Sequence, residues 1–209
     1  MEKSLAVLVM FSFLIGQSVH GFESNPANNK VQKILKVPLI PTGYGVTKTQ
    51  KNDYYLASLL IDKDALLQNA DAEGIVYIDA TKRMEFKFVA DRIISGRTFA
   101  RQLAAAIKIN NTREEIKESK AQISRFIRFF RRSINKGDIL RFDYHSSFGT
   151  RVYLNKRRLG EIPYSSVFYR VLLRMWLGNQ PPSSQFKSGI LGQNGDEYAI
   201  SMQKRYKTT

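Results

Sequence analysis

The sequence of 209 residues contains no cysteine, and its only histidines are His20 and His145. Without cysteine the chain has no disulfide bond, thiolate metal site, iron–sulfur cluster or cysteine nucleophile. The scarcity of histidine argues against a histidine-ligated metal and against a histidine-dependent catalytic system. The sequence therefore predicts no metal site and no cofactor.

Long apolar runs are also missing. The N-terminal run, Ser4–Gly16, has 13 residues, whereas a membrane-spanning helix needs about 20. Because this run follows Lys3 and precedes small residues near Gly21, residues 1–21 are expected to be a cleavable secretory signal, and the protein to be secreted or periplasmic. An uncleaved anchor and a buried first helix are the alternatives. We expect residues 22–35 to be a disordered lead-in, residues 36–192 the folded domain, and residues 193–209 a basic C-terminal tail.

Acidic residues are few, because 18 Asp and Glu stand against 33 Lys and Arg, which gives a formal net charge of +15. The most basic segment carries Arg125, Arg128, Arg131 and Arg132 beside an apolar stripe, and a second basic cluster lies at Lys156–Arg158. A basic amphipathic helix can bind an anionic lipid surface. The same pattern is also typical of a helix that packs its stripe on a sheet and turns its arginines to solvent. No nucleic-acid motif accompanies the charge, so no specific nucleic-acid partner is expected.

The hydrophobic pattern changes several times between a strand period and a helix period. The expected strands are Tyr54–Ile61, Lys82–Val89, Ile139–His145, Thr150–Leu154 and Leu159–Ile162, and the expected helices are residues 96–109, 112–135 and 166–177. This order predicts an α+β fold in which a layer of helices covers a large antiparallel sheet.

Five segments, in sequence order, resemble the chalcone isomerase-like family as found in bacterial secreted members. The segments are Gly43–Lys48, Tyr54–Leu59, Lys82–Phe86, Lys136–Ile139 with Phe148–Val152, and Trp176–Gly192. The resemblance implies an open-faced sandwich, in which a large antiparallel sheet and a layer of helices enclose a ligand cleft.

Enzymes of this family close a hydroxychalcone into a flavanone, so the resemblance also implies which positions of this sequence lie in the cleft. The reaction moves negative charge from a phenolate to an enolate, which a cation and preorganised donors stabilise. The family's Arg, Tyr, Asn and last hydroxyl are replaced here by Thr47, Phe99, Ala106 and Met175, its strand Thr falls on or next to Tyr55, its Lys is replaced by Gln102, and Lys48 is a near substitute for the Arg. The resemblance thus implies a chain without the family's catalytic groups.

Three functional hypotheses follow. The first is a non-catalytic protein that holds a small apolar or fatty-acid-like ligand between sheet and helices, because Phe99, Ala106 and Met175 make the cleft apolar. A solid core is the alternative for these residues. The second hypothesis is an isomerase with relocated groups, which would use Lys48, Tyr55 and Gln102. The third is a module that docks on an anionic membrane through its basic helix.

Overall fold

The computed structural model describes residues 32–50, 52–68 and 72–209, in which seven strands form one sheet. The strands follow each other in chain order, and each is antiparallel to the one before it. The α+β fold with a large antiparallel sheet is therefore confirmed. The strands are β1 (Gln32–Ile34), β2 (Val37–Thr49), β3 (Asn52–Asp62), β4 (Lys82–Phe88), β5 (Ile139–His145), β6 (Gly149–Leu154) and β7 (Arg157–Ile162). The helices are α1 (Lys63–Gln68), α2 (Ala72–Tyr77), α3 (Gly96–Asn110), α4 (Arg113–Glu118), α5 (Lys120–Ile127), α6 (Ser166–Leu177), α7 (Ser184–Ile190) and α8 (Asp196–Thr208).

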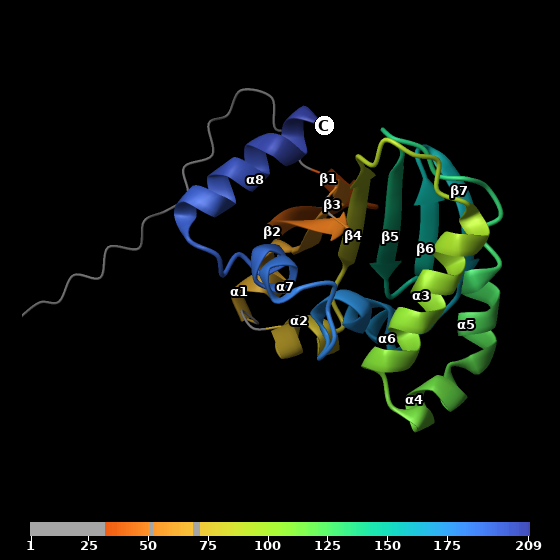
Figure 1. The fold of residues 1–209 in the computed structure, drawn as a ribbon. Helices are drawn as coiled ribbons and strands as arrows, with labels where there is room; N and C mark the ends of the chain where they lie inside the picture. Colours follow the sequence, from red (N-terminus) through yellow and green to blue (C-terminus); the bar gives the residue numbers. More distant parts are fainter. Residues whose placement is uncertain (1–31, 51, 69–71) are drawn as a thin grey trace, which may run out of the picture. The chain divides into compact units, whose positions relative to one another are not determined.

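One face of the sheet carries the main hydrophobic core, and helices α3, α5, α6 and α7 lie on this side (Figure 1). Phe86 and Phe142, on neighbouring strands, pack against Trp176 of α6 with ring centroids 4.8 and 5.7 Å away. Phe126 of α5 lies 5.5 Å from Phe142 and 5.6 Å from Phe168. Since each large ring removes roughly 150–250 Å² from water, this layer of aromatic side chains is a main source of stability.

The opposite face of β2 and β3 is covered by α8. Side chains alternate along a strand, so Leu56 points away from the main core, and it packs against Met202 and Tyr206 of α8. The Tyr206 hydroxyl donates a hydrogen bond to Glu85 Oε1 at 2.7 Å. Residues 193–209, expected to be a basic tail, thus include a helix that packs on the sheet.

A buried ion pair on the same outer face joins β4 to β5. Arg83 donates two hydrogen bonds to the carboxylate of Asp143, at 2.6 and 2.7 Å, and both side chains are buried. Arg83 also donates to Gln32 Oε1 at 2.7 Å. Gln32–Ile34 were expected to lie in the disordered lead-in, but they form strand β1 on the edge of the sheet.

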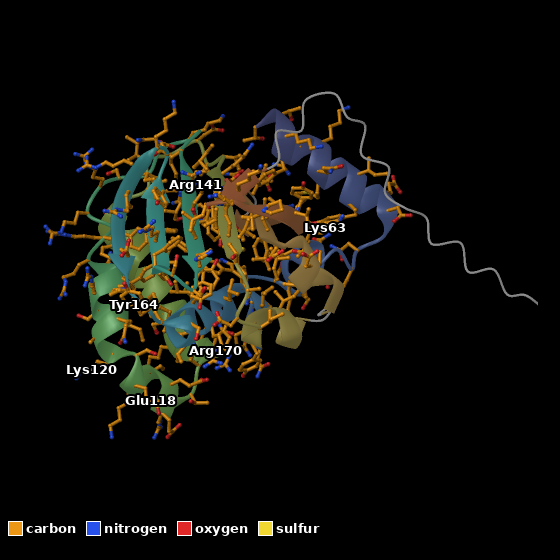
Figure 2. The ribbon with its side chains drawn as sticks, turned by 180° about the vertical axis from the view of Figure 1, so that it is seen from behind. Lys63, Glu118, Lys120, Arg141, Tyr164 and Arg170 are labelled. Carbon is orange, nitrogen blue, oxygen red and sulfur yellow. The ribbon has the colours of Figure 1, made fainter. Side chains whose placement is uncertain are left out.

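The prediction of a single long helix over residues 112–135 is wrong. Helix α4 ends at Glu118 and α5 begins at Lys120 (Figure 2), and the chain between them contains only Ser119. The start of the helix was placed correctly, because the Thr112 hydroxyl accepts a hydrogen bond from the Glu115 N–H and the Glu115 carboxylate accepts one from the Thr112 N–H. This reciprocal pair is a capping box.

The end of the expected helix was misplaced by eight residues, since α5 ends at Ile127. The chain then turns, and Ile134 exchanges two backbone hydrogen bonds with Ile94 at 2.9 Å. Phe130 and Ile134 are nevertheless buried in the core. The helical spacing of apolar residues therefore continues beyond Ile127, and for this reason the sequence pattern did not indicate where the helix ends.

Residues 1–31, which include the expected signal at 1–21, lie outside the described residues. Within the described ranges, none of the helices combines the length and the apolar character that crossing a bilayer requires.

Candidate functional site

Thr47 and Tyr55, two of the predicted cleft positions, are neighbours on the core face of the sheet. They are direct partners in the register of β2 and β3, and both are buried. The Tyr55 hydroxyl accepts a hydrogen bond from Trp176 Nε1 at 3.0 Å. Burial raises the pKa of Tyr55 to about 12, so its phenol stays protonated at neutral pH and is a poor general base.

The predicted cleft positions on the helices are packed into the core. Phe99 is 4% exposed, and its ring meets Phe88 and Phe130 edge-on at 5.6 and 5.4 Å. Met175 is 2% exposed, and the half-buried Ala106 packs against the same core. None of these side chains can donate a hydrogen bond to a developing oxyanion, so these positions supply packing contacts and no electrostatic stabilisation.

Lys48, Tyr55 and Gln102, the candidates for a relocated catalytic site, are not assembled into one. Lys48 and Gln102 are exposed, whereas Tyr55 is buried. Gln102 Oε1 accepts a hydrogen bond from the neighbouring Tyr54 hydroxyl at 3.1 Å. No hydrogen bond in the described part of the chain joins any two of the three predicted groups.

An open pocket of about 560 Å³ lies where α2, α3 and α6 end. This volume is within the ~300–1,000 Å³ that is usual for small-molecule sites. None of the predicted cleft residues lines it. The lining residues are Val76, Tyr77, Ile109, Asn110, Asn111, Thr112, Arg174, Leu177, Gly178, Asn179 and Lys187.

The pocket combines an apolar side with two cations. The positive charge of Arg174 is compensated by Glu115, because the Arg174 guanidinium donates hydrogen bonds to both carboxylate oxygens of Glu115. It also donates to the Tyr77 hydroxyl. Burial alone would raise the pKa of Glu115, but the hydrogen bonds from Arg174 and Thr112 outweigh it and hold this pKa below its usual value. Lys187 Nζ donates to the Gly178 carbonyl at 3.1 Å, and two of its three N–H donors have no further partner in the described chain.

Hydrogen bonds hold the rim of this pocket in place. Asn110 donates to the Gln180 carbonyl at 3.0 Å and accepts from the Gln180 N–H at 2.8 Å, which connects α3 to the chain after α6. Asn111 donates to the Val171 carbonyl at 3.2 Å. The sequence did not predict this pocket, because its walls come from helices far apart in the chain. The polar run Asn110–Thr112 at the end of a helix is the one local signal.

Arg125, Arg128, Arg131 and Arg132, predicted as a candidate membrane face, line a separate groove of about 380 Å³ between the end of α5 and β7. Only Arg125 lies within α5, since the other three follow its last residue, Ile127. The apolar stripe beside them, which includes Phe126 and Phe130, is buried in the core. The stripe is therefore not available for insertion into a membrane.

A buried lysine that the sequence did not single out lies at the start of β4. Lys82 is 2% exposed, and its Nζ donates to the carbonyl oxygens of Ile75 and Ile78 at 2.5 and 2.6 Å. It therefore satisfies carbonyl groups at the end of α2. Burial lowers the pKa of Lys82 to about 7. Lys82 lines neither the pocket nor the groove described above, and its hydrogen bonds connect the start of β4 to α2 and to the chain just after it.

Comparisons with known proteins agree with the geometry of the sheet. Among solved structures, a fatty-acid binding protein of Arabidopsis thaliana has a TM-score of 0.56 to this chain, with 14% sequence identity, and the match covers 77% of this chain and 88% of that one. At this identity the likeness shows the fold alone. No curated protein sequence matches the chain. The model of the chalcone isomerase-like family matches residues 27–192, and the chain therefore belongs to that family.

Proposed function

We propose that this protein is a non-catalytic member of the family that binds a small amphipathic ligand, with an apolar chain and an acidic group. The single observation that carries the proposal is the 560 Å³ pocket at the ends of α2, α3 and α6, where apolar and cationic side chains meet. Secretion or a periplasmic location, expected from residues 1–21, belongs to the same proposal.

The non-catalytic part of the proposal rests on the packed cleft positions. Chalcone cyclisation needs a cation and fixed donors close to the migrating charge, and removal of one such donor costs about 2.7–4 kcal/mol of transition-state stabilisation. Phe99, Ala106 and Met175 supply none of these groups and are packed within the aromatic core. Their packing supports the proposal that these three residues stabilise the fold and take no part in catalysis.

The location of the ligand follows from the chemistry of the pocket walls. Ile109 is 62% and Tyr77 44% exposed, and together with Leu177 they offer an apolar surface to a chain. Lys187 lies on the same pocket with unused donors, whereas Arg174 is occupied by Glu115. We therefore assign the acidic group of the ligand to Lys187 and its chain to Ile109 and Leu177.

The fold relative supports this class of ligand, because it is a fatty-acid binding protein. In the described residues of the present chain, the space between the sheet and helices α3, α5 and α6 is filled by rings, so the ligand is placed in the pocket that adjoins this core. The first hypothesis from the sequence placed the ligand between the sheet and the helices, whereas this proposal places it in the neighbouring pocket.

Calorimetry with laurate, a soluble fatty acid, tests the proposal. We expect one laurate per chain and a raised melting temperature, since a ligand that binds only the folded state stabilises it. Lys187→Met should weaken laurate binding by about ten- to a hundredfold, because a hydrogen bond to a charged group is worth about 1.5–3 kcal/mol. Ile109→Ser should weaken binding through its loss of apolar contact.

Lys204→Met is the matched control, because Lys204 is an exposed lysine of α8 outside the pocket. It should bind laurate as the unmodified protein does. Absence of both binding heat and thermal shift with laurate, or equal weakening by Lys187→Met and Lys204→Met, would refute the proposed pocket.

A further inference from the structure

The groove between α5 and β7, here called the arginine groove, is lined by six arginines and two apolar residues. The arginines are Arg125, Arg128, Arg131, Arg132, Arg157 and Arg158, and the apolar residues are Phe129 and Leu159. All six arginines are exposed, while Phe129 and Leu159 are half-buried. The groove therefore has guanidinium walls and an apolar floor.

Two local features of the backbone bring the arginines together from separate elements. On one side, α5 ends at Ile127 and the chain continues through tight turns, which carry Arg128, Arg131 and Arg132. On the other side, the β6–β7 register shifts so that Leu159 has no partner on β6, which is the pattern of a β-bulge. Arg157 and Arg158 come immediately before this bulge.

Phe129 fixes the distance between these two sides. Its ring lies on Gly160 so closely that a Cβ atom on Gly160 would fall 2.1 Å from Phe129 Cε1. Phe129 also packs against the buried Phe126, with ring centroids 6.2 Å apart. A packed contact between the turn that follows α5 and strand β7 thus joins the two sides of the groove.

The charges of the arginine groove are nearly uncompensated. Among the described residues, the only ion pair made by the six arginines is that of Arg158 with Glu161, at 3.3 Å. Glu161 also accepts a hydrogen bond from Arg151 at 2.5 Å, so this one carboxylate is shared between two cations. Arg128 makes a long hydrogen bond to the Ser124 hydroxyl at 3.4 Å. Like charges gathered in this way repel each other and attract a multivalent anion.

The chemistry of the walls and floor limits what can bind. Guanidinium groups bind phosphate-type oxyanions through two parallel N–H donors. Below the floor, a space lined by Arg132 and by apolar residues such as Phe129 and Phe130 has a volume of only about 10 Å³, and a single water molecule already needs ~10–15 Å³ of such space. An acyl chain cannot enter below the floor, and the six arginines of the walls favour a charged group in the groove.

From these observations we infer that the arginine groove is a binding site for a compact polyanion with two or more phosphate-type groups. The polyanion is either a free phosphorylated molecule or the headgroup of an anionic lipid whose chains stay outside the protein. This site is separate from the amphipathic-ligand pocket, since the two share no lining residue.

Calorimetry with inorganic tripolyphosphate tests the inference on the full chain. We expect binding of one tripolyphosphate per chain that weakens as salt is added, because salt screens exposed charges. The double variant Arg128→Gln/Arg157→Gln should weaken this binding at least tenfold. Both residues are exposed, and an unchanged melting temperature will show that the variant is folded.

Lys204→Gln/Lys207→Gln is the matched control, since it removes two exposed positive charges from α8. It should weaken tripolyphosphate binding less than threefold. Glu161→Gln supplies a test in the opposite direction, because it removes the carboxylate that pairs with Arg158 and so releases this arginine. We expect it to tighten tripolyphosphate binding severalfold.

Co-sedimentation with cardiolipin vesicles, whose headgroup carries two phosphates, identifies the source of the anion. If the headgroup is the natural partner, the protein will sediment with these vesicles and Arg128→Gln/Arg157→Gln will not; if only tripolyphosphate binds, the partner is a free polyanion. Two results overturn the inference. One is no binding of either probe, and the other is equal weakening by the groove variant and the α8 control, which would mean that net charge alone attracts the anion.

Discussion

At the scale of single residues, Tyr55 shows how a polar group is kept in this core without becoming reactive. Its hydroxyl accepts a hydrogen bond from Trp176, and its ring lies 5.1 Å from Phe86 and 5.6 Å from Phe88. Burial favours the neutral phenol and raises its pKa to about 12. A phenol held in this way contributes packing and one hydrogen bond, and it is not available as a base at neutral pH.

Lys82 is the buried residue whose protonation has the clearest consequence for stability. Its pKa is about 7 in the folded chain, against an ordinary value of 10.5, because of burial. Between these two values the unfolded chain binds more protons at this residue than the folded chain does. The contribution of Lys82 to the free energy of unfolding should therefore rise as pH increases from 7 to 10.

The change Lys82→Met tests this prediction by chemical denaturation at several pH values. The variant should be less stable by about 1–3 kcal/mol, since the carbonyls of Ile75 and Ile78 lose their donor. The difference from the unmodified protein should be larger at pH 10 than at pH 7. Lys33→Met, at an exposed lysine of β1, should show no such trend. A difference that is constant or falls with pH would show that Lys82 stays charged in the fold.

At the scale of the elements, helix α8 completes the outer face of the sheet. Tyr206 is 5% exposed, and its hydroxyl donates to the buried carboxylate of Glu85. Lys87 Nζ donates to the Tyr206 carbonyl at 2.6 Å and lies 4.6 Å from the centre of the Tyr206 ring. The end of α8 is thus joined to β4 by polar contacts beneath a small apolar cluster.

Tyr206→Phe should lower the free energy of unfolding by about 1–3 kcal/mol, because it leaves the buried Glu85 carboxylate without this donor. Thermal or urea unfolding measures the change. Tyr164→Phe is the control, because Tyr164 is 82% exposed (Figure 2) and its loss of a hydroxyl should have no effect. Equal stability of the two variants would show that the contact between α8 and Glu85 is not important for folding.

The elements that the sequence predicted correctly are those in which the periodic apolar pattern begins and ends at about the same residues as the observed strand or helix. Lys82–Val89 alternated over its whole length, and the helix from Ser166 to Leu177 was bounded by a Ser cap and by Gly178. Helix α8 was missed because only Met202 and Tyr206 are buried along it. Two buried residues in 13 are too few to produce a helical period.

The candidate sites show the same limit. The family resemblance assigned Thr47 and Tyr55 to the cleft one by one, and their direct pairing in the register of β2 and β3 is seen only in the structure. Whether Phe99 and Met175 line a hollow or fill a core could not be predicted, since this depends on how rings from several elements pack in three dimensions. The basic runs near Arg128 and Arg157 were visible in the sequence, but their meeting across one groove depends on the end of α5 and on the bulge in β7.

At the scale of the whole molecule, the chain has the sheet and helices of its family, and Phe99, Ala106 and Met175, which the resemblance predicts to lie in the cleft, pack with an aromatic core. Charge has been concentrated elsewhere, in the arginine groove and at the mouth of the amphipathic-ligand pocket. The two proposals above therefore place binding in these open sites, and they assign packing, and no stabilisation of an anion, to Phe99, Ala106 and Met175.

The most direct test of this conclusion is the absorbance decay of a hydroxychalcone, recorded with and without the purified protein between pH 6 and pH 9. Since Phe99, Ala106 and Met175 offer the migrating charge neither a cation nor a hydrogen-bond donor, we predict that the rate with protein equals the rate in buffer at every pH. A decay rate that rises in proportion to protein concentration would contradict the absence of catalytic groups.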